Sequence, residues 1–196
     1  MYFEKDIIKE GNPLLRQKCS EVSLPLSSSD LDVLKNLYEY IIISANEDLV
    51  KQYNIRPGVG IAAPQVGVCK RMFAMNAPDI FDNNKPPYIY AVVNPKIIAK
   101  SKEMTYLPGG EGCLSVDRET NGITPRHYSI TFKAAIYDFK TNKIKYLTKT
   151  LTGFPAIVFQ HEYDHLDGIM FVDKLYDHLD DIEPLFETEK TEKTEE

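Results

Sequence analysis

Features that would assign the chain to several broad classes are missing from its 196 residues. No apolar run approaches the roughly 20 residues that a membrane-spanning helix requires. The opening stretch, MYFEKDIIKEGNPLL, lacks the basic start and apolar middle of a secretory signal peptide. The net charge of −6 lacks the basic excess that is typical of nucleic-acid binding. We therefore expect a soluble, cytoplasmic protein with no membrane contact and no direct nucleic-acid binding.

Cysteine is also scarce, and its three copies are too widely spaced to make a convincing disulfide framework. A reducing compartment is the expected setting, and a cysteine there is free to act as a thiolate ligand. Cys19 follows a polar segment and Cys69 begins an apparent strand, so we interpret both as buried, inert thiols. Cys113 differs because it lies in GGEGCLSVDR, where glycine allows the backbone to approach another group closely.

The apolar pattern predicts an α+β fold, with more strands than helices. A first helix is expected in SSSDLDVLKNLYEYIIISANED, with Ser28 or Ser29 as its N-cap. A second is expected from about Phe154 to Asp167, where Gly168 is a natural stop. Strands are expected in CKRMFAM and YIYAVVNPKII, and a β-hairpin in HYSITFKAAIYDF and IKYLTKTL.

The chain has a length that suits one domain with a tail. We expect residues 1–187 to form a single catalytic domain. The last residues, 188–196, are charged, repetitive and free of apolar side chains, so we predict that they are a disordered acidic tail.

Two of the four histidines stand four residues apart in FPAIVFQHEYDHLDGIMF. On a helix, residues at i and i+4 share a face, so His161 and His165 can point at one metal ion. Glu162 is rotated by about 100° from His161 and can reach a water that the ion holds. H-E-x-x-H therefore indicates two metal ligands and a general base.

A catalytic metal site normally has three protein ligands, so a third must be found. The metzincin pattern fails because Phe171 stands where its last histidine should be. A metalloendopeptidase using Glu183 or Glu187 remains an alternative. Cys113 is the stronger candidate, since a thiolate and two imidazoles give a site with one open position. That donor set suits zinc or ferrous iron.

The glycine-rich stretch GVGIAAPQ covers residues 58–65. It fits a variant of the dinucleotide fingerprint, but Pro64 and Gly67 interrupt the long helix that this motif should open. Two interpretations stay open. The stretch is either a structural loop or a substrate-facing loop that offers backbone groups and the Gln65 amide.

Three stretches together, GVGIAAPQ, EGCLS and HEYDHLDG, resemble the signature motifs of peptide deformylase in the family's order. GNPLLRQKCSEV is similar to the family's N-terminal stretch, so the resemblance spans roughly residues 5–175. EGCLSVDR resembles the second bacterial subtype, which is common in Gram-positive lineages. The departures, Ile61 for leucine and Asn12 for aspartate, change no reactive group.

The resemblance implies antiparallel β-sheets around a central helix that carries H-E-x-x-H. It implies that the enzyme removes formyl from the N-terminal formyl-methionine of newly made proteins and releases formate. Cys113, His161 and His165 would bind the metal, with Fe(II) favoured and Zn(II) as a substitute. Glu162 would be the general base and acid. N-formylmethionyl nascent polypeptides are the implied substrates. The ribosome is a candidate partner, although the acidic tail differs from the basic helix thought to dock some deformylases there.

The resemblance also implies the groups that meet the substrate. The Gln65 amide and the Leu114 N–H would stabilise the oxyanion, and Gly60 would hydrogen-bond the substrate backbone. Helical spacing adds an apolar face beside His161, because positions three, four and seven residues earlier share its side. These positions and one loop residue could line a methionine pocket or simply form core: Phe154, Ile157, Val158 and Val59.

Overall fold

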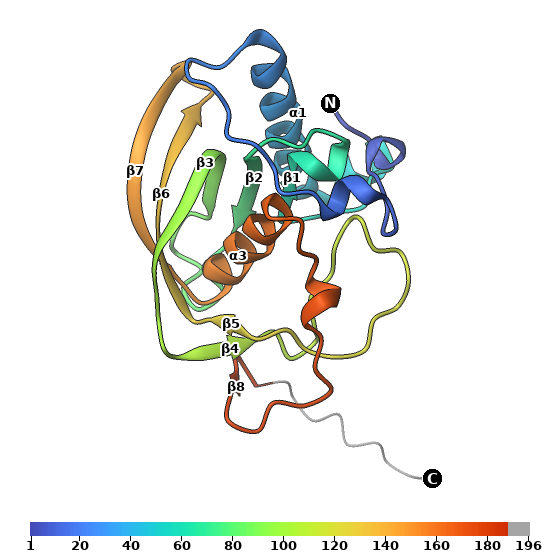
Figure 1. Cartoon of the computed structure of the whole chain (residues 1–196), viewed down its shortest axis with the longest axis vertical. Helices are drawn as coiled ribbons and strands as arrows, with labels where there is room; N and C mark the ends of the chain where they lie inside the picture. The colour runs from blue at the N-terminus through green and yellow to red at the C-terminus, as the bar shows by residue number, and fades with distance from the viewer. Residues whose placement is uncertain (188–196) are drawn as a thin grey trace.

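A computed structural model describes residues 1–187, and the tail predicted at 188–196 lies outside the described residues. Figure 1 shows helices and sheets gathered around α3. The α-helices and strands in chain order are α1 (Ser28–Ser44), α2 (Glu47–Tyr53), β1 (Gly60–Ala62), β2 (Met72–Ala77), β3 (Tyr88–Lys100), β4 (Met104–Tyr106), β5 (Arg126–His127), β6 (Ser129–Asp138), β7 (Lys143–Thr152), α3 (Phe154–Leu166) and β8 (Glu183–Pro184). Short 3₁₀ helices are η1 (Glu4–Asp6), η2 (Pro13–Arg16), η3 (Ala63–Val66) and η4 (Phe171–Lys174).

The larger sheet has five strands in the order β1-β2-β3-β6-β7, and every neighbouring pair is antiparallel. The predicted hairpin is β6 and β7, and its turn includes Asn142 with a φ of 53°. Asparagine tolerates this left-handed conformation better than most residues. A smaller sheet has the order β5-β4-β8, in which β4 is antiparallel to β5 and parallel to β8.

Strand β2 is buried on both faces because a helix packs on each side of the larger sheet. Met72 and Ala74 belong to the core cluster that contains the apolar face of α1. Phe73 belongs to the second cluster, which contains the apolar residues of α3. The smaller sheet also contacts α3, through β5, and Figure 1 shows this helix in the middle of the molecule. The predicted α+β class with a central helix is confirmed.

The N-cap of helix α1 lies one or two residues earlier than the sequence suggested. The N-cap is Ser27, whose side-chain oxygen accepts a hydrogen bond from the Asp30 N–H at 3.2 Å. Ser28 and Ser29, the predicted caps, already have a place in the first helical turn. A cap requires non-helical backbone together with a free side-chain oxygen, and Ser27 has both, since its φ and ψ are extended.

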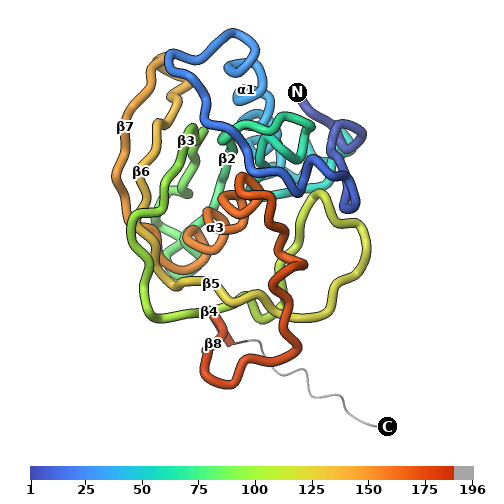
Figure 2. The backbone as a smooth tube through the Cα atoms, in the orientation of Figure 1, coloured from blue at the N-terminus to red at the C-terminus, as the bar shows by residue number. Residues whose placement is uncertain are grey.

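Helix α3 is buried on most of its circumference, as its apolar sequence predicted. It ends where Gly168 adopts a φ of +72°, and a Cβ there would overlap the carbonyl of Arg16. The N-terminal segment crosses this end of the helix, because the Cys19 N–H donates to the Leu166 carbonyl at 2.8 Å. Figure 2 follows that blue segment past α3. Within residues 1–187, no helix has the length and hydropathy needed to cross a membrane.

Candidate active site

A cysteine and two histidines converge at the middle of the molecule. The Cys113 sulfur and one ring nitrogen each of His161 and His165 lie within 4.8 Å of one another. The Cys113 Sγ is 3.3 Å from His165 Nε2. Cys113 and His165 are buried, and His161 is partly exposed toward a pocket. Among the described residues, this is the group of metal-binding side chains that meets at one point.

Two separate elements bring these ligand atoms together. His161 and His165 share a face of α3, as their spacing predicted, with ring centres 5.0 Å apart. Cys113 lies in the loop between β4 and β5, far from α3 in sequence. The Arg56 guanidinium fixes this loop, because Nη2 donates to the Cys113 carbonyl at 2.7 Å and Nη1 donates to the Val116 carbonyl at 3.1 Å.

The two histidines favour the charged form of the Cys113 sulfur. Burial alone would raise the pKa of the Cys113 thiol, but His165 and His161 bring that pKa well below its ordinary value. The thiolate is the form of cysteine that binds metal ions. Ser115 adds its N–H, which donates to the Cys113 sulfur at 3.4 Å. Cys113 is therefore favoured as a thiolate, the form that can bind a metal ion, over the neutral thiol.

A buried carboxylate orients His161. The His161 Nδ1 donates to Glu111 Oε2 at 2.7 Å, which leaves the other ring nitrogen for the ligand group. Burial opposes ionisation of Glu111, yet Arg126 and His161 lower its pKa to about 2. Arg126 binds both Glu111 oxygens, at 2.7 and 2.8 Å, and is itself buried. A carboxylate behind a ligand histidine fixes the tautomer and the ring orientation.

The buried charges continue beyond Glu111. Arg126 Nη1 donates to Asp164 Oδ2 at 2.5 Å, and Lys174 donates to the same oxygen at 2.6 Å. Arg126 thus connects the Cys113 loop to the last turns of α3. A buried charge is tolerable when it is paired and hydrogen-bonded in this way.

Glu162 is buried and lines the pocket. Burial raises the pKa of its carboxyl to about 7. Its Oε2 atom finds no hydrogen-bond partner among the residues that the structure describes. On one side the carboxyl lies against Gly60, where an added Cβ would overlap its Oε1 atom. A carboxyl so placed can exchange a proton with a molecule in the pocket.

Gln65 lies beside the sulfur, in η3. Its Nε2 atom donates to Cys113 Sγ at 3.3 Å and to Ser115 Oγ at 3.2 Å. Its Oε1 atom accepts from the Ala62 N–H at 2.8 Å, which fixes the orientation of the amide. Leu114 follows Cys113 and packs against Gly58, and its carbonyl accepts a hydrogen bond from Lys9 at 2.9 Å.

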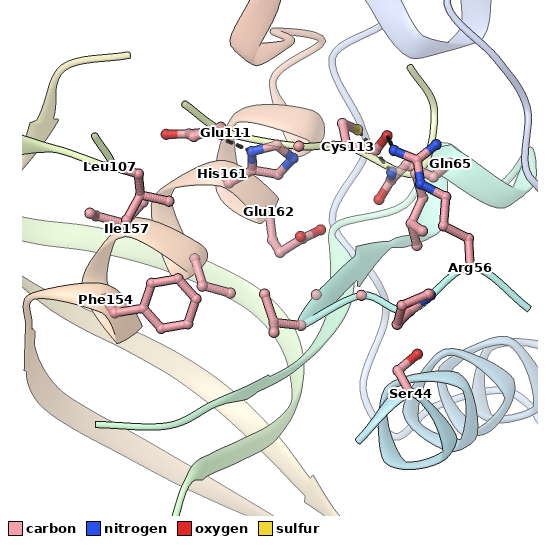
Figure 3. Close-up of a pocket in the computed structure, with 17 residues that line it drawn as sticks. Ser44, Arg56, Gln65, Leu107, Glu111, Cys113, Phe154, Ile157, His161 and Glu162 are labelled. Carbon is pink, nitrogen blue, oxygen red and sulfur yellow. Dashed lines mark hydrogen bonds and ion pairs between the residues drawn. The ribbon is translucent and has the colours of Figure 1, made fainter. Parts of the chain in front are cut away.

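A pocket of about 370 Å³ opens beside these groups. Figure 3 shows Glu162, His161 and Cys113 along one side of it, with Phe154 and Ile157 nearby. The residues expected to meet the substrate all line this pocket: Val59, Gly60, Gln65, Leu114, Phe154, Ile157 and Val158. Lining residues that sequence reasoning missed include Ser44, Arg56, Leu107 and Glu111.

The metalloendopeptidase alternative is not supported by this geometry. Glu183 lies in β8, is exposed, and pairs with Thr105 through its backbone carbonyl. Glu187 is likewise exposed and does not join the cysteine and the two histidines. Neither glutamate supplies the third ligand that this reading required.

The donor set fits a divalent transition metal. One thiolate and two imidazoles are the ligand types of zinc and ferrous iron, and three protein donors leave a position for water or substrate. Glu162 lines the same pocket, where its carboxyl would lie close to such a molecule. The residues present therefore fit a metal-dependent hydrolase.

Comparisons with known proteins agree with this chemistry. The family model of polypeptide deformylase matches residues 4–180. A peptide deformylase of Halalkalibacterium halodurans is 50% identical over 171 residues, which cover 87% of this chain and 90% of that protein. Peptide deformylase 2 of Bacillus cereus is 48% identical over 180 residues, 92% of this chain and 91% of that protein.

Solved structures give the same result. A class I type b peptide deformylase from Acinetobacter baumannii, in its Met-Ala-Ser bound form, has a TM-score of 0.65 and 32% identity. The match covers 86% of this chain and 96% of that one. On the evidence of its motifs, its site and these relatives, the chain belongs to the polypeptide deformylase family.

Proposed function

We propose that this deformylase hydrolyses the formyl group of N-formylmethionyl polypeptides in the pocket beside Cys113, with residues 1–187 acting as one catalytic domain. One observation carries the proposal. Cys113 and His161, two members of the cluster with His165, line a pocket that the buried Glu162 also lines.

The proposed metal ligands are Cys113, His161 and His165. Fe(II) is the ion that we propose for the cell, and Zn(II) fits the same donors. When bound, such an ion supplies a Lewis acid and lowers the pKa of a water molecule toward neutrality. Glu111 supports this role by holding His161 through Nδ1 at 2.7 Å.

Glu162 is the proposed general base and then the general acid. It takes a proton from the water that adds to the formyl carbon, and it returns that proton to the nitrogen as the carbon–nitrogen bond breaks. Formate and a free N-terminal amine are the products. Glu162 lines the pocket in which this exchange would occur, and no described residue holds its Oε2 atom by a hydrogen bond.

Gln65 and Leu114 are the proposed donors to the oxygen on which negative charge develops. The Gln65 Nε2 atom, 3.3 Å from the Cys113 sulfur, is already held beside the metal-binding group. The backbone N–H of Leu114 follows the ligand cysteine directly. One preorganised donor of this kind is typically worth about 3 to 4 kcal/mol of transition-state stabilisation.

Substrate recognition is proposed to combine a backbone contact and an apolar pocket. Gly60 lies on β1 at the pocket edge, where its backbone can pair with an extended peptide. Phe154, Ile157 and Val158 are proposed to receive the unbranched methionine side chain, with Val59 at the rim. The substrates are nascent polypeptides of the cytoplasm, which makes the ribosome a candidate partner.

The decisive experiment is hydrolysis of formyl-Met-Ala-Ser by protein purified without oxygen and analysed for metal. We expect the Fe(II) form to release formate, and Glu162→Gln to lose nearly all turnover while it still binds metal. Cys113→Ala should lose both the metal and the activity. The exposed Glu119→Gln is a matched control that should behave as the parent. Absence of turnover with Fe(II), Ni(II), Co(II) and Zn(II) would reject the proposal.

A further inference from the structure

The other two cysteines form a pair. The Cys19 and Cys69 sulfur atoms lie 3.1 Å apart, although the residues are 50 positions apart in sequence. Both thiols also lie 3.9 Å from the Gln17 carbonyl oxygen. The expectation that both thiols are buried is confirmed for Cys19 and wrong for Cys69, which is only half-buried and lies against the Cys19 sulfur.

The backbone around the pair accounts for this approach. Ser20 and Lys70 form an isolated parallel bridge, and Cys19 and Cys69 each directly precede a bridged residue. The Ser20 N–H donates to the Cys69 carbonyl at 3.2 Å, and the Arg71 N–H donates to the Ser20 carbonyl at 2.8 Å. Two parallel, hydrogen-bonded backbones hold equivalent side chains on the same side. The sulfur atoms are thus brought together by main-chain contacts on both segments.

The two thiols differ in how easily a reagent can reach them. Cys69 has access to solvent, while Cys19 has only 4% of its surface exposed. Burial and the neighbouring Cys69 raise the pKa of the Cys19 thiol. Exchange begins at an accessible sulfur and is completed by a second thiol within reach. This asymmetry assigns Cys69 as the entry point and Cys19 as the resolving thiol.

We propose that Cys19 and Cys69 are a dithiol–disulfide couple that is oxidised by low-molecular-weight disulfides, RSSR. The Cys69 thiolate attacks one sulfur of RSSR, forms the mixed disulfide Cys69–S–S–R and expels one RS⁻. Cys19 loses its proton to solvent and attacks the Cys69 sulfur, which expels the second RS⁻. Two cysteines are oxidised to one disulfide, and RSSR is reduced to two thiols.

The bridge would join two segments that both adjoin the active site. Cys69 follows η3, the element that carries Gln65. The backbone N–H of Cys19 donates to the Leu166 carbonyl, at the end of the helix that carries His161 and His165. Neither cysteine lines the pocket. Oxidation should therefore stabilise the fold around the site while the deformylase reaction continues.

To test for the Cys19–Cys69 disulfide, the zinc-loaded protein is treated with oxidised glutathione in the absence of oxygen. Trypsin cuts after Lys18 and after Lys70, so the bridge should appear in mass spectrometry as a cross-linked peptide pair containing Cys19 and Cys69. The melting temperature should rise by about 5 to 15 °C, as expected when a disulfide closes a loop of this length. Dithiothreitol should reverse both changes. Cys113 should stay unmodified because it is bound to the metal.

Single variants separate the two roles. Cys19→Ser should stop at a stable glutathione adduct on Cys69, with no rise in melting temperature. Cys69→Ser should react far more slowly, because only the buried thiol remains. Both variants should hydrolyse formyl-Met-Ala-Ser as the parent does. A parent protein that keeps the adduct on Cys69, gives no cross-linked peptide, or cross-links through Cys113 would overturn the proposal.

Discussion

At the residue scale, the candidate site depends on a buried carboxylate behind His161. Glu111 accepts a hydrogen bond from His161 and two from Arg126, and it is buried. We predict that Glu111→Gln weakens metal affinity by about 10- to 100-fold, because the ring of His161 loses its charged partner. Competition with a chelator of known affinity measures this directly. Glu119→Gln is the control, and equal affinities in the two variants would contradict the role assigned to Glu111.

Gly60 gives a steric prediction at the same scale. A Cβ at this position would overlap the Glu162 carboxyl, so Gly60→Ala should displace the proposed base. A displacement of about 1 Å at a reacting group can cost about 100-fold in rate, and we expect kcat/KM to fall by that order. Gly109→Ala is the matched control because nothing lies within 4 Å of its added Cβ. Steady-state kinetics of both variants at constant metal content provide the comparison.

The sequence predicted the members of the metal-binding group but not the residues that support it. His161 and His165 are separated by one helical turn, so a local pattern was sufficient. Cys113 could be predicted as a ligand from its glycine-rich surroundings and from the shortage of other candidates for the third ligand. Glu111 meets His161 across 50 residues, and Arg126 is fixed by two separate carboxylates. Contacts of this kind depend on the folded arrangement and leave no periodic signal in the chain.

At the element scale, the identity of the N-cap of α1 can be tested by mutation. Ser27 accepts from the Asp30 N–H and also donates to the Asp30 carboxylate at 2.7 Å. We predict that Ser27→Ala lowers the free energy of unfolding by about 1 kcal/mol. Ser28→Ala, one residue later, should change it little, since no cap bond is lost. Urea denaturation of metal-loaded protein distinguishes the two, and a larger loss for Ser28→Ala would contradict this cap.

Elements formed by local patterns were the easier ones to predict. The β6–β7 hairpin pairs residues close in sequence, and alternation with a polar turn identified it. Helix α3 was marked by apolar residues and by Gly168. The pairing of β8 with β4 joins Thr105 to Glu183 in a two-residue strand. A two-residue strand is too short to show the alternation of apolar and polar residues by which a strand is predicted from sequence.

At the scale of the whole molecule, metal binding should contribute to stability. The proposed ligands link the Cys113 loop to α3, and an ion that binds only the folded state stabilises it by mass action. At 100 times the dissociation constant this amounts to about 2.7 kcal/mol, or about 5 to 10 °C in melting temperature for a chain of this size. Removal of the metal without oxygen should lower the melting temperature by that amount.

The matched variant for this experiment is His165→Ala. It should melt at the same temperature with and without the chelator, because one ligand is already lost. The parent should recover its original melting temperature when Fe(II) or Zn(II) is returned. A melting temperature of the parent that does not respond to the chelator would mean that the ion makes no contribution to the stability of the fold.

The central position of α3 has a consequence for the order in which the chain is synthesised. Strands β1, β2, β3, β6 and β7 all precede α3 along the chain, yet Phe73 and Phe132 pack against its Phe159. During translation, the strands emerge before the helix that covers their apolar face. A chain stalled ahead of residue 154 therefore leaves these two aromatic side chains uncovered, and such surfaces invite chaperone binding or aggregation.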